Sequence, residues 1–444
     1  MDSSEQRSEK LTWIQLPESS LIDILRALLL NDIFNVTACD KRWLLVGNGA
    51  PHFPVLDDMP LAVMLLPPLK SRLPRVKSLL CTHIEDWQPL YAPALKTAGH
   101  LIQQLVMRLS ENIGESELVH ILTFCPCLRR FELTDYDLVG ALTGDFLKHL
   151  PAGLAELRLC LIRFLHDAGL KAAVEAAPQL QSVCLEGVDE LTSPGMCALA
   201  DLRLLTELSL VCTRAAAVPQ VSEEALLCIL ACESRLQALE VSEKAGPPLS
   251  LQAGGDHFMK ALGKHSLRSL SLSGVVGISD SALRLLATSC PELRELSLFR
   301  PGNQISSGGL QQALESLPCL ESLSLGCVAD FPGAFGAVQA AHRLKSLEMT
   351  RYFRTAAEVS LVSVLRKLQA SFPCLSSAVF RGSFSAEQVS ACRMTLEIQP
   401  DEDLQLQWQQ LDEQTFWLQW FSEQESRFRV SVQLQRCFRE TDFL

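Results

Sequence analysis

The chain has 444 residues, of which 48% are hydrophobic and only 6% aromatic, and its formal net charge is −12. This charge, without a basic stripe, argues against nucleic acid as the main partner, because backbone binding depends on lysines and arginines that displace counterions. Apolar runs such as Leu61–Leu66 and Ala225–Cys232 are far shorter than the roughly 18 residues of a membrane span, and the first ten residues hold no apolar signal core. We therefore expect a soluble protein of the cytosol or nucleus without a membrane partner.

The N-terminal region predicts a small helical segment after a polar tail. Residues 1–12 are expected to be disordered, and two or three short helices are expected between Leu16 and Trp43. Apolar side chains with helical spacing mark the first helix: Leu21, Ile24, Leu25 and Leu28. Asp32 is a candidate N-cap of the second helix, which places Val36, Cys39 and Trp43 on one side. So short a segment buries little surface alone and needs a neighbour.

Residues 13–46 resemble the F-box, the motif by which substrate receptors of cullin-based ubiquitin ligases attach to the Skp adaptor. The matching residues, which the resemblance makes candidates for adaptor binding, are Leu16, Pro17, Leu21, Ile24, Leu25, Leu28, Asp32, Val36 and Trp43, with Cys39 beside them. The chain departs from the family at Leu25, where an aromatic residue is common, and at Ala38, where a basic residue or valine is common. The alternative is that this segment only caps the first repeat of the region that follows.

Residues 47–75 predict a junction rather than a single regular element. Five prolines fall within Gly47–Arg72: Pro51, Pro54, Pro60, Pro67 and Pro68. Because proline restricts the backbone, this junction would hold the helical segment at a set distance from the rest of the chain.

Residues 76–395 repeat one short pattern about twelve times. In the clearest copy, Leu267, Leu270 and Leu272 have the L-x-x-L-x-L spacing of a strand with one buried edge, and Leu283 and Leu286 have helical spacing. The first apolar anchors recur from Val76 to Leu375 at steps of 24 to 31 residues. The pattern predicts an α/β leucine-rich-repeat solenoid, curved, with parallel strands on the concave face and helices outside. The repeats resemble the cysteine-containing class that follows F-boxes, for example in Cys-Pro-x-Leu at Cys290.

One side chain in each predicted strand, between the second and third anchors, should point onto the concave face because strand side chains alternate. This column is predicted to contain Leu80, Val106, Glu132, Arg158, Cys184, Ser209, Glu240, Ser271, Ser297, Ser324, Glu348 and Val379. A row of serines of this kind is typical of a plain solvated sheet surface, and a binding site is the alternative.

Aromatic and guanidinium groups gather after two predicted strands near the C-terminal part of the array. These candidate substrate-binding residues are Phe299, Arg300, Arg351, Tyr352, Phe353 and Arg354. Arginine, tyrosine and phenylalanine are types that concentrate binding energy at protein interfaces. The alternative is that Phe299 and Phe353 fold back over the longer repeat.

The longer repeats and the C-terminus carry further expectations. The stretch Glu243–Gly255 is rich in glycine and proline and is expected to be a mobile loop. Residues 396–444 are expected to cap the last repeat, and 428–434 alternate like a strand. A partner hook made by Trp417 and Trp420 is the competing idea.

No motif in the sequence supports catalysis. Nucleotide-binding loops, H-E-x-x-H and G-x-S-x-G are absent, so neither an enzyme nor a cofactor is expected. The sixteen cysteines mostly lie inside the repeats, as Cys125 and Cys290 do, and are expected to be reduced thiols without zinc. His257 and His265 are expected at the surface.

The resemblance and the repeats together predict a non-catalytic substrate receptor of an SCF-type ubiquitin ligase. Its expected partners are the Skp adaptor, through it a cullin scaffold, and a protein substrate held by the repeats. The alternative is a leucine-rich-repeat scaffold or inhibitor without a role in ubiquitination.

Overall fold

The computed structural model describes residues 78–82, 95–96, 99–109, 113–135, 142–213, 221–232, 235–244, 246–326, 331–351, 377–382, 404–410, 415–422 and 427–434. It divides into two compact units, Met1–Gln181 and Ser182–Leu444. The F-box-like segment, the proline-rich junction and the candidate residues Tyr352, Phe353 and Arg354 lie outside the described residues.

The first unit contains a parallel sheet whose strands alternate with helical segments. The strands are β1 (Ser78–Thr82), β2 (Gln104–Leu109), β3 (Arg130–Asp135) and β4 (Glu156–Cys160), paired in chain order. The helical segments are η3 (Gly99–Leu101), α7 (Glu115–Phe124), η4 (Asp145–His149) and α8 (Asp167–Ala176).

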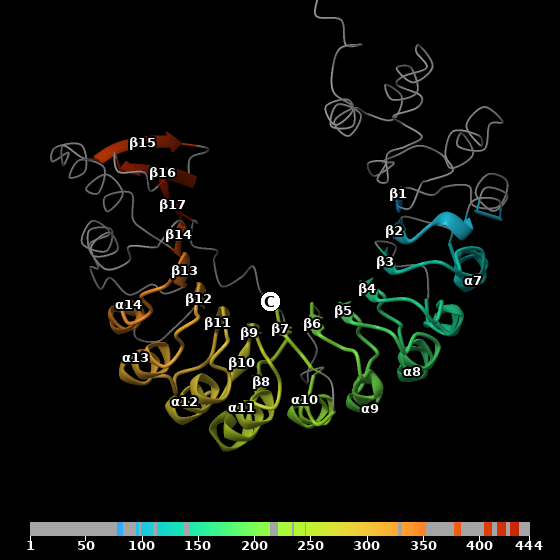
Figure 1. Ribbon diagram of the computed structural model, residues 1–444, viewed down its shortest axis with the longest axis horizontal. Coiled ribbons are helices and arrows are strands. Elements are labelled where there is room, and N and C mark those ends of the chain that lie inside the picture. The colour runs from blue at the N-terminus through green and yellow to red at the C-terminus, as the bar shows by residue number, and fades with distance from the viewer. Residues whose placement is uncertain are drawn as a thin grey trace, which may run out of the picture. The chain divides into compact units, whose positions relative to one another are not determined.

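The second unit continues the same alternation over more repeats. Its first strands are β5 (Ser182–Glu186), β6 (Glu207–Cys212), β7 (Ala238–Glu243), β9 (Ser269–Ser273), β11 (Glu295–Phe299), β12 (Ser322–Gly326) and β13 (Ser346–Arg351), all parallel. Its helical segments are α9 (Ser193–Cys197), η5 (Ala198–Asp201), α10 (Glu223–Leu230), η6 (Gln252–Gly255), α11 (Asp256–Leu262), α12 (Asp280–Ser289), α13 (Ser307–Glu315) and α14 (Phe331–Val338). Within this unit the strands follow the inner side of an arc and the helices the outer side (Figure 1).

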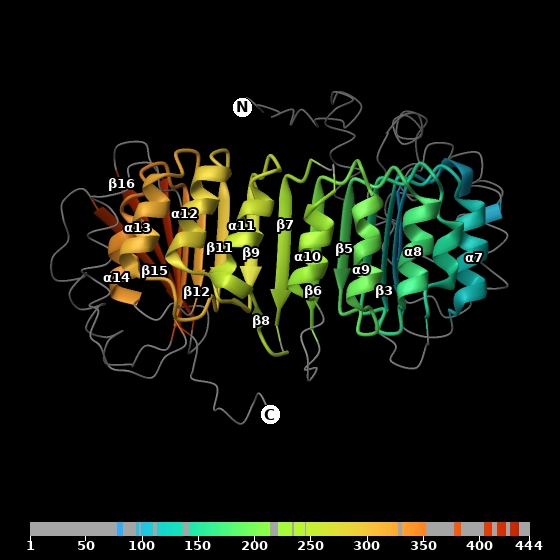
Figure 2. The ribbon, with the colours of Figure 1, turned by 90° about the horizontal axis from the view of Figure 1, so that it is seen from below.

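Each repeat buries its leucines between its own strand and its own helix. In the copy used above, Leu267, Leu270, Leu272, Leu283 and Leu286 are all at most 1% exposed. The helices α10, α11, α12 and α13 lie side by side and cover one face of the sheet (Figure 2). The fold is therefore the predicted α/β leucine-rich-repeat solenoid, in which each layer is stable because it packs on its neighbours.

The register of the strands also agrees with the sequence. The predicted column is paired residue by residue in the second unit, from Cys184 with Ser209 through Ser297 with Ser324 to Glu348 with Val379. In the first unit Val106 pairs with Glu132, which pairs with Arg158. The sheet face opposite the helices, called the open face below, is thus built from the predicted residues.

The prediction of a mobile loop at Glu243–Gly255 is wrong. This insertion forms β8 (Leu249–Ser250), which pairs in parallel with β10 (Val275–Val276), and then η6. Leu249 and Leu251 are 3% and 5% exposed, so two leucines anchor the segment despite its glycines and prolines. The glycines instead supply positive φ, +68° at Gly254 and +82° at Gly255, where the chain turns into α11.

The C-terminal part of the second unit extends the sheet. The strand β14 (Ser377–Gly382) pairs in parallel with β17 (Arg427–Leu434), which pairs antiparallel with β16 (Thr415–Ser422). The strand β15 (Leu404–Gln410) pairs antiparallel with β16. The strand expected at 428–434 is confirmed, and Trp417 and Trp420 lie on β16.

Candidate protein-binding surface

The open face of the second unit is the candidate binding surface, because no described helix covers it (Figure 1). Its side chains are mostly small. Seven serines point onto it from β9 to β13: Ser269, Ser271, Ser273, Ser297, Ser322, Ser324 and Ser346. All seven are partly exposed, so another chain could approach the backbone of these strands closely.

Five glutamates point onto the open face of the second unit: Glu186 on β5, Glu207 on β6, Glu240 on β7, Glu295 on β11 and Glu348 on β13. Neighbouring hydroxyls orient two of them. The Ser209 hydroxyl donates to the Glu240 carboxylate at 2.7 Å, and the Ser269 hydroxyl donates to the Glu295 carboxylate at 2.9 Å. Serine hydroxyls therefore orient acidic side chains on the open face, and one of these bonds, between Ser209 and Glu240, lies within the predicted column.

The open face of the first unit has a different charge pattern. Arg130 makes ion pairs with Glu132 at 3.1 Å and with Glu156 at 3.3 Å. Arg108 and Arg158 add positive charge on the adjacent strands β2 and β4. This face therefore mixes both signs, whereas the described strand side chains from β5 to Thr350 include no lysine or arginine.

Of the six predicted substrate-binding residues, the structure describes the side chains of Phe299 and Arg300. Phe299 is half-buried at the end of β11, between Ser273 and Gly326 on the neighbouring strands, and its ring lies against Gly326. Arg300 is exposed, has φ +55°, and donates its backbone N–H to the Gly326 carbonyl at 2.9 Å. Arg351 ends β13, and its side chain, like Tyr352, Phe353 and Arg354, lies outside what the structure describes. Their role in binding stays a prediction.

Charged residues at the strand ends near Phe299 make contacts that were not predicted from the sequence. Lys244 makes an ion pair with Glu186 at 3.0 Å. Glu243 is buried at 2% exposure, next to the Cys212 thiol. Burial, followed by the negative charge of Glu243, raises the pKa of Cys212 far above its ordinary value, so this thiol stays protonated. Cys212 is therefore a packing residue and not a nucleophile.

The described cysteines are all free thiols, and burial separates them into reactive and inert groups. Burial raises the pKa of Cys125 to about 12 and that of Cys290 to about 11. Cys127 is exposed.

We expect iodoacetamide at mildly alkaline pH to label Cys127 first and Cys125 only after unfolding, because the thiolate is the reacting species. Peptide mass spectrometry of the native protein over time would measure this order, and simultaneous labelling of both cysteines would contradict it.

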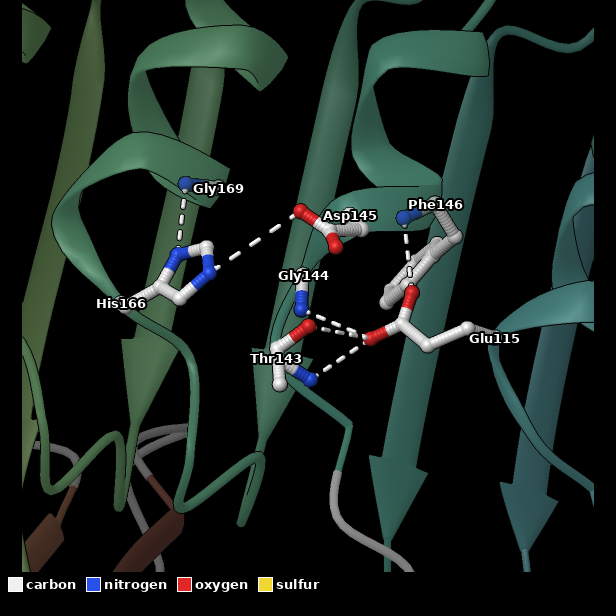
Figure 3. A network of polar contacts seen from close by, with 7 residues as sticks. All are labelled: Glu115, Thr143, Gly144, Asp145, Phe146, His166 and Gly169. Atoms are coloured by element: carbon white, nitrogen blue, oxygen red, sulfur yellow. Dashed lines mark hydrogen bonds and ion pairs between the residues drawn. The ribbon is translucent and has the colours of Figure 1, made fainter.

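A network of carboxylates at helix starts holds successive repeats together (Figure 3). Glu115, the first residue of α7, accepts hydrogen bonds on Oε1 from the Thr143 N–H at 2.6 Å, the Thr143 hydroxyl at 3.1 Å and the Gly144 N–H at 2.9 Å. Its Oε2 accepts from the Phe146 N–H at 2.7 Å. One side chain thus satisfies the turn that begins η4 in the next repeat.

The same connection recurs in the second unit. Glu223 accepts from the Gln252 N–H at 2.7 Å, and Asp256 from the Ser281 hydroxyl at 3.0 Å. Asp280 accepts from the N–H and the hydroxyl of Ser306 at 2.8 and 2.6 Å. The sequence does carry serine or acidic residues at helix starts, for example in Ile-Ser-Asp at 278–280, but such residues alone indicate only a cap for the same helix.

The two histidines expected at the surface differ in exposure. His265 is buried, not at the surface, and its Nε2 lies 3.1 Å from the Leu230 carbonyl oxygen. His257 is exposed as expected. Among the described residues, no group of histidine, cysteine, aspartate or glutamate could hold a metal ion, and no helix has the length and apolarity to cross a membrane.

The repeats themselves make this chain a leucine-rich-repeat protein. No family model matches it. It is similar to F-box/LRR-repeat protein 4 of Bos taurus, with 32% identity over 183 residues, which are 40% of this chain and 28% of that protein. The chain therefore spans less than a third of that relative's length.

Two solved structures resemble the fold distantly. A TLR13–ssRNA13 complex matches with a TM-score of 0.40 and 15% identity, over 70% of this chain and 44% of that one. A Rad7 and Elc1 complex in yeast matches with a TM-score of 0.44 and 14% identity, over 71% and 90%. Neither likeness is close enough to carry an argument about binding.

Proposed function

We propose that this chain is the substrate receptor of an SCF-type ubiquitin ligase. In this proposal the segment Leu16–Trp43 docks on the Skp adaptor, which connects it to a cullin scaffold, and the repeats hold a protein substrate. The chain itself is not an enzyme, and it acts in the cytosol or nucleus. The other subunits transfer ubiquitin.

Three observations support the proposal. The repeats form an array with an open sheet face, the kind of surface that can hold another protein. The similarity to an F-box/LRR-repeat protein covers 183 residues. The F-box-like residues Leu16 and Pro17 precede the array in the same order as in F-box proteins with leucine-rich repeats. The similarity to F-box/LRR-repeat protein 4 is the observation that carries the ubiquitin role.

Recovery of the Skp adaptor by the full-length chain tests this function. We expect the wild-type chain to capture purified adaptor, and Leu16→Ala/Pro17→Ala to recover at least about tenfold less, because truncation of anchor residues at an interface is costly. Leu204→Ala/Pro291→Ala is the matched control, since it removes the same side chains from exposed positions of the repeats.

Two outcomes would favour the alternative of a leucine-rich-repeat scaffold without a ubiquitin role. One is that wild type and Leu16→Ala/Pro17→Ala recover equal amounts of adaptor. The other is that neither recovers any, although both fold with the same circular dichroism as the control variant.

A further inference from the structure

The open face of the second unit has a charge that selects among protein partners. Glu186 on this face is paired with Lys244, and the four other glutamates, which we call the acidic row, are Glu207, Glu240, Glu295 and Glu348. They lie on four strands of one sheet, and the side chains between them are mostly serine, alanine and glycine. A chain that lies across these strands would therefore meet carboxylates without first meeting bulky side chains.

Among the side chains that the structure describes from β5 to Thr350, the positive groups near this face lie in loops at the strand ends. Lys244 is paired with Glu186, and Arg294 and Lys345 share Glu321 at 3.9 and 2.8 Å. Arg268 precedes β9, and Arg300 follows β11. Because three of these five cations already face a carboxylate outside the acidic row, the described open face between β6 and β12 keeps a negative field.

Phe299 adds an aromatic surface to the same face. It stands between Ser273 and Gly326, two small residues, so part of its ring is exposed above them. An aromatic ring attracts lysine and arginine side chains through its negatively charged face. Phe299 and the acidic row thus favour the same class of ligand.

The spacing of the acidic row suggests the form of the ligand. Successive glutamates of the row lie one or two strands apart, which corresponds to about 5 to 10 Å at the usual strand separation. An extended chain advances about 3.3 Å per residue, so a basic residue at every second or third position would match the row.

We propose that the open face of the second unit binds an extended, lysine- and arginine-rich segment of a protein, with Glu207, Glu240, Glu295, Glu348 and Phe299 as its binding residues. This inference rests on the proposed function in taking the bound segment to be part of the ubiquitin-ligase substrate. Complementary charge at such a surface raises the association rate and rejects acidic partners.

Fluorescence anisotropy with the full-length chain tests this assignment. The probe is a labelled peptide of about 12 residues with lysine at every third position and serine elsewhere. We expect binding at low ionic strength, and about tenfold weaker binding by Glu207→Gln/Glu240→Gln/Glu295→Gln/Glu348→Gln. Phe299→Leu should weaken binding about threefold, because the apolar volume is kept while the ring is lost. The same peptide with glutamate in place of lysine should not bind.

The matched control is Glu190→Gln/Glu224→Gln/Glu292→Gln/Glu315→Gln, which changes the net charge equally at exposed positions outside the strands of the sheet. It should bind the lysine peptide as the wild type does. Equal loss in the control and the open-face variant would show that only overall charge matters and would overturn the proposal. So would the absence of any binding by the wild type.

The adaptor experiment separates this inference from the proposed function. The open-face variant should still capture the Skp adaptor, and Leu16→Ala/Pro17→Ala should still bind the lysine peptide. If the wild type captures no adaptor but binds the peptide through the acidic row, the ubiquitin role is wrong and the binding surface stands. If adaptor capture succeeds and peptide binding fails, only this inference is wrong.

Discussion

Glu115→Ala is expected to lower the free energy of unfolding of the first unit by about 2 to 4 kcal/mol. The Glu115 carboxylate is half-buried and accepts four hydrogen bonds from Thr143, Gly144 and Phe146 (Figure 3). Alanine leaves three backbone N–H groups at the start of η4 without this acceptor. Hydrogen bonds to a charged group are stronger than neutral ones. Water does not fully replace the lost carboxylate as an acceptor for these N–H groups, because the turn is partly buried.

Two measurements check this expectation. Amide hydrogen exchange at Thr143, Gly144 and Phe146 should become faster, and the urea midpoint of the first unit should fall. Glu115→Gln should be intermediate, because glutamine keeps one acceptor oxygen but turns an amide N–H2 group toward backbone donors.

Glu175→Ala is the control for Glu115→Ala. Glu175 is exposed on α8 and makes only an i,i+4 ion pair with Lys171 at 4.0 Å, so its removal should change stability by about 0.5 kcal/mol or less. Unchanged amide exchange in Glu115→Ala would mean that the carboxylate does not hold the two repeats together.

The sequence predicted those parts of the fold that depend on local periodicity. The anchors Leu267, Leu270 and Leu272, the helix through Leu283, and the register of the concave column were all correct. In a solenoid each residue contacts mainly its own repeat and the next one. Apolar spacing within one repeat therefore determines which side chains are buried and which reach the open face.

Features that depend on contacts between repeats were not predicted. The bond between Asp280 and Ser306 joins residues 26 positions apart, and hydropathy does not encode it. The insertion at Leu249 appeared mobile because its glycines and prolines are visible in sequence, whereas its pairing with β10 is not. Among the candidate site residues, Phe299 was expected after a strand, whereas it is the last residue of β11, and its contact with Gly326 was not predicted.

Gly274→Ala is expected to destabilise the second unit by about 2 to 4 kcal/mol. Gly274 has φ +67°, and a Cβ atom there would lie 2.5 Å from the backbone oxygen of Glu243. Gly274 also donates its N–H to the Phe299 carbonyl at 2.8 Å and accepts from the Leu249 N–H at 2.9 Å. The backbone cannot move away from the clash without breaking the connection to β8 or to β11.

Gly336→Ala is the control. It makes the same glycine-to-alanine change, but we expect it to raise the stability of the protein. Gly336 lies exposed in α14, and a Cβ there would meet no atom within 4 Å. Alanine should stabilise this helix by about 0.5 to 1 kcal/mol. Thermal unfolding of both variants beside the wild type measures the contrast, and a Gly274→Ala protein as stable as Gly336→Ala would contradict it.

Gly274→Ala also tests whether the turn at residue 274 positions Phe299 for binding on the open face. The Gly274 N–H holds the carbonyl of Phe299, the aromatic residue assigned to the open face, so a shift of residue 274 moves the backbone beneath that ring. A folded Gly274→Ala protein should therefore bind the lysine peptide more weakly than Gly336→Ala does. If the two bind equally although Gly274→Ala is destabilised, the strand ends stabilise the repeat without positioning Phe299.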